Sequence, residues 1–495
     1  MLITFGKDYF EARDGRFAPV RMDTSKLING HALLLGASGM GKSHTIKKMI
    51  RDARQSCPTA RIHVFDVHGD LDIEGASTAA FSQTADFGLN PLRVDPDPDY
   101  GGVPRCIEDF ISTINDASLT PLGGKQESVL RNLLLDVYRN FGFDARDAQT
   151  WKVNALETRL VSSGADNRLY LDVPMEQKDE AKRLGARWEP AHRLWWVHSD
   201  RYRGDITRWR PAFRPRTYPG VEDVLRYAQQ INNERFLGSD QEGIQALHAL
   251  NRAAKALQRR TLDHARAQNQ GVHDDGLEGA VDDARHTAIA AYTRYCNAIR
   301  TGLELESLQK YDSPEVLKSV SDRLGNFLST GLFRAQELPL DDNNPVWRYK
   351  MDALRYEAKK MAVLFKLQDI FSKAVARGQQ ADVVEVVVLD ELSTYTSKSD
   401  EKGDGIIGRV SREARKFGLA LWAADQSPAD VPESLIKNVG TKIVLGLPEA
   451  DWPAARNKMR MDDKLLAWVQ PTRTIAVQTK EKGSLRQQWR WVQLT

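Results

Sequence analysis

The sequence predicts an α/β fold in which one parallel β-sheet is interrupted by two insertions. Near the amino end, strand-like and helix-like segments alternate at residues 32–35, 43–55 and 61–66, as they do in parallel sheets. The alternation resumes late in the chain with residues 383–390, an almost wholly apolar run that is typical of a central strand. The residues between these two parts differ in composition, and we expect them to form separate structures.

The composition sets few limits on function. The chain has 495 residues, with 70 Lys and Arg against 67 Asp and Glu, so its formal charge is +3 and any basic surface has to be local. Three scattered cysteines, Cys57, Cys106 and Cys296, argue against a disulfide framework or a cysteine metal site. The amino end does not resemble a signal peptide, and no run approaches the roughly 18 apolar residues of a membrane span. We therefore expect a cytoplasmic protein without an integral membrane segment.

Four segments follow from the shifts in composition. We expect the first part of the sheet-containing core over residues 1–160 and its second part over 313–495. Between them we expect a small basic and aromatic α+β domain at 168–216 and a helical insertion at 217–312. A polar stretch at 270–276 interrupts the helical insertion, which indicates a helical hairpin that serves as a solvated spacer.

The periodicity of the two core parts predicts further elements. These are helices at 103–114, 126–140 and 349–376, strands at 419–424 and 441–445, and a closing hairpin formed by 472–479 and 485–492. We see no internal repeat and no long low-complexity tract.

A glycine-rich motif of the form G-x-x-x-x-G-K-S lies between the first of these strands and its helix. Its glycines let backbone N–H groups surround phosphate oxygens, the helix amino end adds positive potential, and Lys42 can reach the outer phosphates. Ser43 would hold Mg²⁺. A coincidental glycine loop is the alternative, but the strand and helix on either side favour binding and hydrolysis of a nucleoside triphosphate. The residues that we expect to contact ATP are Gly36, Ala37, Ser38, Gly39, Met40, Gly41, Lys42, Ser43 and His44.

Two adjacent carboxylates lie at the end of the apolar run at 383–390: Asp390 is its last residue, and Glu391 follows directly. Asp390 would bind Mg²⁺ directly or through water, and Glu391 would orient and polarise the attacking water. Acidic residues are also common at strand ends for structural reasons alone. A Glu directly after the Asp further indicates that an extra strand lies between the phosphate-loop strand and the acidic strand.

A polar residue and a basic helix complete the candidate catalytic set. Gln426 lies just beyond the predicted strand 419–424, where it could contact both the terminal phosphate and the attacking water, although a loop glutamine without a role fits as well. An arginine supplied by a neighbouring subunit can stabilise the transition state of phosphoryl transfer. We favour Arg415 over Arg412 for this role. The helix that carries them offers Arg409, Arg412, Arg415 and Lys416.

These residues resemble a known family. The phrases RKFGLAL at 415–421, ADQSP at 424–428, IKN at 436–438 and TKI at 441–443 look like the final third of the HerA/FtsK superfamily of ring-forming, DNA-pumping ATPases. DVHGD at 66–70 is similar to the D-P-H-G-E phrase of that family. The resemblance implies a RecA-like P-loop core, ATP and Mg²⁺ as cofactors, a homo-hexamer, and DNA or another polymer drawn through a central pore.

The resemblance has departures that leave the subfamily open. Only about 35 residues precede the phosphate loop, so the amino-terminal barrel typical of HerA proper does not fit, and neither a membrane domain nor a winged-helix tail typical of FtsK is expected. Val67 replaces the family proline, and Asp425 replaces a small residue before Gln426. Conjugative secretion ATPases and coupling proteins share the same core. Three hypotheses follow: a DNA translocase or helicase with a nuclease, defence or mobile-element partner; a secretion-type ATPase; and a regulatory NTPase switch.

The small insertion resembles a domain of unknown function that is often attached to primases and other plasmid or phage replication proteins. Aromatic faces can stack on unpaired bases while arginines bind phosphates, but a domain of about 45 residues also needs aromatic residues to build its core. Both interpretations stay open. The aromatic residues are Trp188, Trp195, Trp196, Tyr202 and Trp209, and they alternate with Arg187, Arg193, Arg201, Arg203, Arg208 and Arg210.

Overall fold

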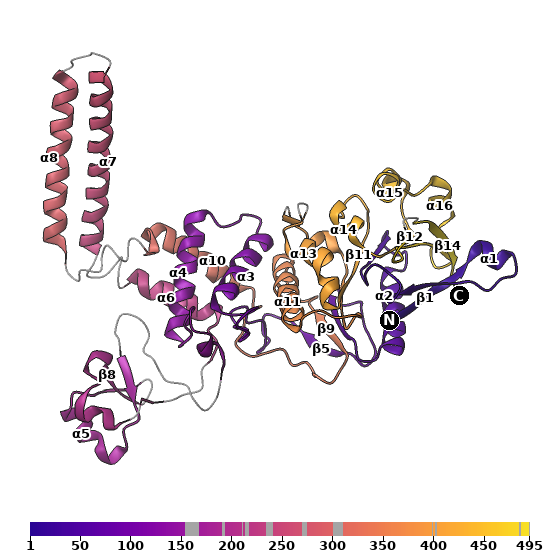
Figure 1. Cartoon of the computed structure of the whole chain (residues 1–495), viewed down its shortest axis with the longest axis horizontal. Coiled ribbons are helices and arrows are strands. Elements are labelled where there is room, and N and C mark those ends of the chain that lie inside the picture. The colour runs from indigo at the N-terminus through magenta and orange to yellow at the C-terminus, as the bar shows by residue number, and fades with distance from the viewer. Residues whose placement is uncertain are drawn as a thin grey trace. The chain divides into compact units, whose positions relative to one another are not determined.

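The computed structural model describes residues 1–153, 168–190, 194–209, 211–212, 217–233, 241–269, 275–299, 310–397, 399–400, 403–484 and 487–494. The chain divides into two compact units (Figure 1). The first unit consists of residues 1–121, 145–152 and 327–495, and the second of residues 122–144 and 153–326.

One large sheet forms the centre of the first unit. From β12 to β5 every neighbouring pair of strands is parallel, whereas the pairs from β2 to β12 are antiparallel. The strands, in their order across the sheet, are β2 (Pro19–Asp23), β1 (Leu2–Asp8), β14 (Trp489–Gln493), β13 (Thr474–Thr479), β12 (Thr441–Gly446), β3 (Ala32–Gly36), β11 (Leu419–Asp425), β10 (Glu385–Leu389), β4 (Arg61–Asp66), β9 (Val346–Lys350) and β5 (Ser77–Ala80).

The central strands are apolar on both faces because both faces of the sheet are covered. Every residue of β3, β10 and β11 is buried. Helix α2 (Lys42–Ser56) packs Ile46 and Ile50 into the same cluster as alternate residues of the strands, such as Leu34 and Val388. The residues between these alternate positions, such as Leu33, are buried as well, so the opposite face is also protected from water. Because the strands are buried on both faces, their sequences are unbroken apolar runs.

The other helices of the first unit lie between the strands in sequence. They are α1 (Tyr9–Arg13), α3 (Val103–Ala117), α11 (Tyr356–Arg377), α13 (Ile406–Glu413), α14 (Glu433–Asn438), α15 (Trp452–Met459) and α16 (Asp463–Trp468). The short 3-10 helix η8 (Ala414–Phe417) joins α13 to β11.

The structure confirms most of the predicted core and corrects one element. Strand β11 lies between β3 and β10, which confirms the predicted extra strand. The closing hairpin is present as the antiparallel pair β13 and β14, although residues 485–486 lie outside the described residues. The helix predicted at 349–376 is wrong at its amino end, because Tyr349 belongs to strand β9 and α11 begins only at Tyr356. The Tyr349 side chain is buried against Phe65, with ring centroids 4.8 Å apart, and this packing favours the strand.

The second unit contains the small domain. Its sheet has the order β6 (Arg168–Leu171), β8 (Leu194–His198) and β7 (Arg187–Glu189), with helix α5 (Lys178–Arg183) between β6 and β7. Leu169, Val197 and Trp209 form its main core with Ala181 of α5. The arrangement is the α+β type expected from the sequence, while Arg193 and Arg210 lie outside the described residues.

The rest of the second unit is helical. The two long helices α7 (Gln241–Asn269) and α8 (Asp275–Ala298) pack against each other and confirm the predicted hairpin (Figure 1). Residues 270–274 of its interruption lie outside the described part of the chain. The remaining helices are α4 (Gly124–Asn140), α6 (Val221–Ile231) and α10 (Pro314–Ser329). Within the described residues, no helix combines the length and the apolar character needed to cross a bilayer.

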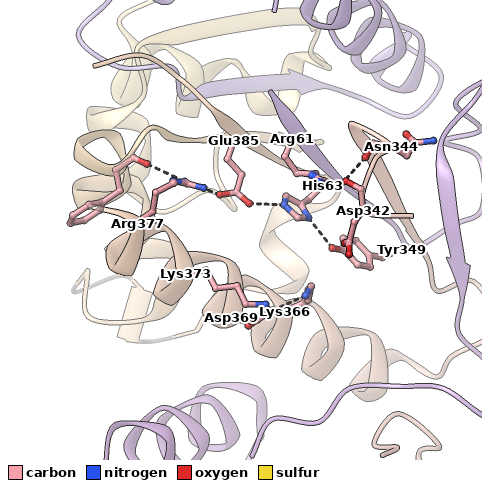
Figure 2. A network of polar contacts seen from close by, with 11 residues as sticks. Arg61, His63, Asp342, Asn344, Tyr349, Lys366, Asp369, Lys373, Arg377 and Glu385 are labelled. Carbon is pink, nitrogen blue, oxygen red and sulfur yellow. Dashed lines mark hydrogen bonds and ion pairs between the residues drawn. The ribbon is translucent and has the colours of Figure 1, made fainter. Parts of the chain in front are cut away.

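A buried polar network links the middle strands of the sheet (Figure 2). His63 of β4 contacts the Tyr349 hydroxyl through Nδ1 and a Glu385 carboxylate oxygen through Nε2, each at 2.8 Å. The other carboxylate oxygen of Glu385 accepts a hydrogen bond from Arg377 at 2.9 Å. Burial lowers the pKa of His63, so the neutral ring fits the site. Because these buried polar groups all have hydrogen-bond partners, the network fixes β4, β10 and α11 relative to one another.

A second buried histidine, His31, directly precedes β3. Its side chain is fully buried, and Nδ1 accepts a hydrogen bond of 2.9 Å from the Leu421 backbone N–H. Burial, together with the charge of Arg415, lowers the pKa of His31 to about 4.

The low pKa of His31 predicts a loss of stability in acid. Between pH 6.5 and pH 4 the unfolded chain binds a proton at this histidine and the folded chain does not, so the free energy of unfolding falls as pH falls. The contribution amounts to about 2 kcal/mol between pH 7 and pH 5. Urea unfolding at several pH values should show a shallower pH dependence for His31→Gln than for the native chain. If the free energy of unfolding had the same slope against pH in both proteins, the low pKa assigned to His31 would be contradicted, whatever the absolute stability of the variant.

Candidate functional site

Four neighbouring strands deliver the predicted site residues to one edge of the sheet. Strands β3, β11, β10 and β4 lie side by side and parallel. The glycine-rich loop 36–43 follows β3, Asp390 and Glu391 follow β10, and Gln426 follows β11. The segment 66–70 follows β4. Since carboxyl ends of parallel strands meet at the same edge, segments nearly 400 residues apart form one site.

The glycine-rich loop has the backbone shape of a phosphate-binding loop. Gly39 and Gly41 adopt φ angles of 79° and 90°, a left-handed region that other residues enter only with strain. Helix α2 then begins at Lys42, so its first N–H groups point into the loop. The Lys42 ammonium donates a hydrogen bond of 2.8 Å to the Gly36 carbonyl oxygen. A nucleotide phosphate would replace the Gly36 carbonyl as the hydrogen-bond partner of this ammonium, because an anion attracts it more strongly than a carbonyl does.

The acidic pair occupies two different environments. Asp390 is only 6% exposed, and burial raises its pKa above the ordinary value, while the charge of Lys42 acts in the opposite direction. One Asp390 oxygen accepts a hydrogen bond of 3.0 Å from the Glu391 N–H. Glu391 has φ 52° and ψ 55°, a left-handed conformation that is rare for residues other than glycine. Such strain concentrates at functional positions, and here it turns the chain directly after the strand.

The Glu391 carboxylate is held from two neighbouring strands. Gln426 donates a hydrogen bond of 3.2 Å from Nε2 to Oε1 of Glu391. His68 approaches Oε2 of Glu391 with its Nε2 at 2.9 Å. The structure therefore brings together Glu391 and Gln426, as expected, and adds His68. The sequence contained a signal for His68, because it stands in the DVHGD phrase after β4, but only the strand order reveals that it faces Glu391.

A further carboxylate lies beside the loop serine. The Ser43 hydroxyl donates a hydrogen bond of 2.8 Å to Oδ2 of Asp70. The segment that carries Asp70 is fixed by Asp66, which is fully buried and accepts hydrogen bonds of 2.9 and 2.7 Å from Nε and Nη2 of Arg348. It is also fixed by the Gly69 N–H, which donates to the other Asp66 oxygen at 2.8 Å. Asp70 and Arg348 were not predicted as site residues.

The chemistry of these side chains fits magnesium bound together with a nucleotide. Across the described residues, no group of three or more His, Cys, Asp or Glu side chains is placed to hold a metal alone. Magnesium does not need such a group, because it keeps several waters and takes one or two protein ligands plus phosphate oxygens. Ser43 and Asp390, with Asp70 adjacent to the serine, supply oxygen atoms of this kind next to the loop.

The candidate arginines lie at the opposite edge of the sheet. Arg409 turns inward and donates a hydrogen bond of 2.7 Å from Nη2 to Gln368, and Arg412 donates to the Gly403 carbonyl oxygen. Arg415 is exposed in η8, which precedes the amino end of β11. Its charge acts on His31, which directly precedes β3. The length of β3, roughly 16 Å at the usual rise per residue, therefore separates Arg415 from the phosphate loop of its own chain.

The turn that carries Arg415 is held in one shape. Arg377 donates hydrogen bonds from Nη2 to the Phe417 carbonyl oxygen at 3.2 Å and to Glu385 at 2.9 Å (Figure 2). Gly418 ends the turn with φ 68°, and a Cβ at this position would lie 2.7 Å from the Asp382 carbonyl oxygen. Two hollows of about 220 and 170 Å³ adjoin the turn, and Arg415 lines both. The guanidinium is thus presented outward from a braced backbone.

Two segments of the chain match known families. Residues 9–97 match the family model described as "Helicase HerA, central domain", and residues 168–211 match a domain of unknown function, DUF5710. Over 61 residues the chain is 33% identical to the DNA double-strand break repair helicase HerA of Pyrococcus furiosus, a match that covers 12% of this chain and 11% of that protein.

A solved structure resembles the chain over its full length. The alignment with VirB4 of Thermoanaerobacter pseudethanolicus covers 100% of this chain and 96% of that chain, with a TM-score of 0.57 and 13% sequence identity. At that identity the likeness shows that the two chains share a fold, and it does not bear on their activities. The family match, the HerA segment and the shared fold together support a P-loop ATPase fold of the HerA/FtsK type for this chain.

Proposed function

We propose that this chain is the subunit of a ring-forming motor that hydrolyses ATP to move or unwind DNA. The observation that carries the proposal is the convergence of the phosphate loop, Asp390, Glu391 and Gln426 at the carboxyl ends of neighbouring parallel strands. Phosphoryl transfer needs a phosphate cradle, a metal ligand and a group that orients water, and these residues supply all three within one site.

Each residue has a role in the proposed reaction. ATP binding moves the Lys42 ammonium from the Gly36 carbonyl onto the outer phosphates. Ser43 and Asp390 would hold Mg²⁺, which would supply positive charge to neutralise the charge that develops in phosphoryl transfer. Glu391 orients and polarises the attacking water, while Gln426 positions the Glu391 carboxylate and can contact the terminal phosphate.

The position of Arg415 supports an oligomeric ring. Because about five residues of strand separate it from its own phosphate loop, it can act only on a nucleotide bound to another subunit. A head-to-tail contact that brings the amino edge of one sheet to the loop of the next subunit repeats around a ring. The expectation of six subunits comes from the family resemblance.

The choice of DNA rests on the relatives. The P. furiosus protein is named as a DNA repair helicase, and the HerA model covers the phosphate loop of this chain. A secretion-type ATPase is the second candidate, since VirB4 shares the fold along the whole chain.

Stimulation of ATP hydrolysis by DNA separates these functions. A DNA motor should hydrolyse ATP faster when DNA is added, whereas a regulatory switch should not respond. Association with membranes during cell fractionation, without stimulation by DNA, would instead support the secretion-type ATPase. Absence of both responses in an active ATPase would contradict translocation.

Two substitutions should divide nucleotide binding from hydrolysis. Lys42→Ala should lose ATP binding, because the outer phosphates lose their cationic partner. Glu391→Gln should still bind ATP but hydrolyse it about a hundredfold or more slowly, since an amide cannot polarise water as a carboxylate does. Calorimetry and phosphate release measure the two steps. Glu433→Gln, which changes a surface glutamate paired with Lys437, is the matched control, and a native rate in Glu391→Gln would refute the assignment.

Mixed rings should test the role of Arg415. Rings of Arg415→Ala alone and of Lys42→Ala alone should both be inactive. When the two proteins are mixed and reassembled, activity should return at interfaces where Arg415 of a Lys42→Ala subunit meets an intact loop. Arg412→Ala serves as the control and should keep most of its activity. A mixture that stays inactive although it forms rings would rule out action across the interface.

A further inference from the structure

The small domain exposes one tryptophan that its own fold does not use. Of the eleven tryptophans in the chain, all within the described residues, Trp188 is the only exposed one, with 46% of its surface accessible. Neither apolar cluster of the small domain includes it. An indole costs free energy when it is left in water, so a packing role does not account for Trp188.

The Trp188 ring is supported from one side. It lies on the edge strand β7, opposite Trp195 of β8. The two ring centroids are 5.6 Å apart with the planes at 61°, an edge-to-face contact. Trp195 itself packs against the main core of the domain. The edge contact fixes the orientation of Trp188, and almost half of its surface stays accessible to a flat ligand.

Cationic side chains lie in the segment that leads into the strand of Trp188. A tight turn joins α5 to β7, closed by a hydrogen bond of 2.9 Å from the Ala186 N–H to the Ala181 carbonyl oxygen. Lys182 and Arg183, which precede this turn, are exposed. Arg187, which follows it, points to the other face of the sheet, where its guanidinium lies 5.6 Å from the Trp196 ring.

Other arginines of the domain have acidic partners. Arg168 pairs with Glu189 at 3.2 Å, and Arg208 pairs with Glu180 at 2.6 Å. Within the described residues Lys182 and Arg183 have no acidic partner. They therefore leave uncompensated positive charge a few residues before the exposed indole in the chain.

We propose that Trp188, with Lys182 and Arg183, forms a binding site for single-stranded nucleic acid. An unpaired base stacks on the accessible face of Trp188, and the two cations contact the flanking phosphates. Exposed aromatic faces beside positive charge are the combination that single strands require, whereas bases in a duplex have no free face. The proposal deepens the proposed function by naming the nucleic acid that the inserted domain binds, and it does not require ATP hydrolysis.

Binding of a fluorescently labelled oligo-dT to the full chain without nucleotide tests the site. Trp188→Ala should weaken binding roughly tenfold or more, and Trp188→Phe should retain most of the affinity because a ring remains. Replacing Lys182 and Arg183 together by alanine should lower the slope of log affinity against log salt by about 0.7 for each phosphate that the variant no longer neutralises. Met175→Ala is the matched control, since Met175 is 73% exposed in the same domain but has no ring.

The controls separate this proposal from the motor itself. ATP hydrolysis without DNA should stay native in Trp188→Ala, which also shows that the ATPase core of the variant folds, and the Trp188→Phe variant controls for folding of the small domain. Native oligo-dT affinity in Trp188→Ala would overturn the proposal even if DNA stimulates the ATPase. An equal loss of oligo-dT affinity in Met175→Ala would overturn it too. So would a Trp188→Ala variant that no longer binds a protein partner but still binds oligo-dT.

Discussion

The parallel alignment of β3, β11, β10 and β4 is the constraint on which the site depends. Each strand contributes one short segment beyond its carboxyl end: the phosphate loop, Gln426, the acidic pair, and the loop that carries His68 and Asp70. These strands pair in continuous parallel register, and almost all of their residues are buried. The rigidity of the sheet thus fixes the distances among groups that are far apart in sequence.

The same sheet separates two functions at its two edges. The carboxyl edge holds the groups that would bind nucleotide and water, whereas the amino edge presents Arg415 from a turn braced by Arg377 and Glu385. A network of buried hydrogen bonds through His63 connects that brace to the middle of the sheet. In the proposed ring, a subunit built in this way would carry one half of an interface site at either end of its strands, which suits a repeated head-to-tail assembly.

The sequence predicted what is encoded in contiguous residues. The glycines of the phosphate loop determine local backbone conformation, and so does the apolar run that precedes Asp390 and Glu391. Both can therefore be recognised in the sequence without a structure. The contact of Ser43 with Asp70, the contact of His68 with Glu391, and the pairing of Arg348 with Asp66 join separate segments, and no local pattern encodes such partners. The helix predicted near Tyr349 is wrong because burial against Phe65, not local propensity, decides the conformation of that segment.

The most direct test of the account is an experimental structure with Mg²⁺ and a non-hydrolysable ATP analogue. The account predicts that the Lys42 ammonium leaves the Gly36 carbonyl and contacts the outer phosphates, and that Mg²⁺ lies about 2.1 Å from the Ser43 hydroxyl oxygen, next to Asp390. It also predicts that Arg415 of an adjacent subunit approaches the terminal phosphate. A nucleotide bound away from the loop at 36–43, or a ring in which Arg415 faces solvent at every interface, would contradict it.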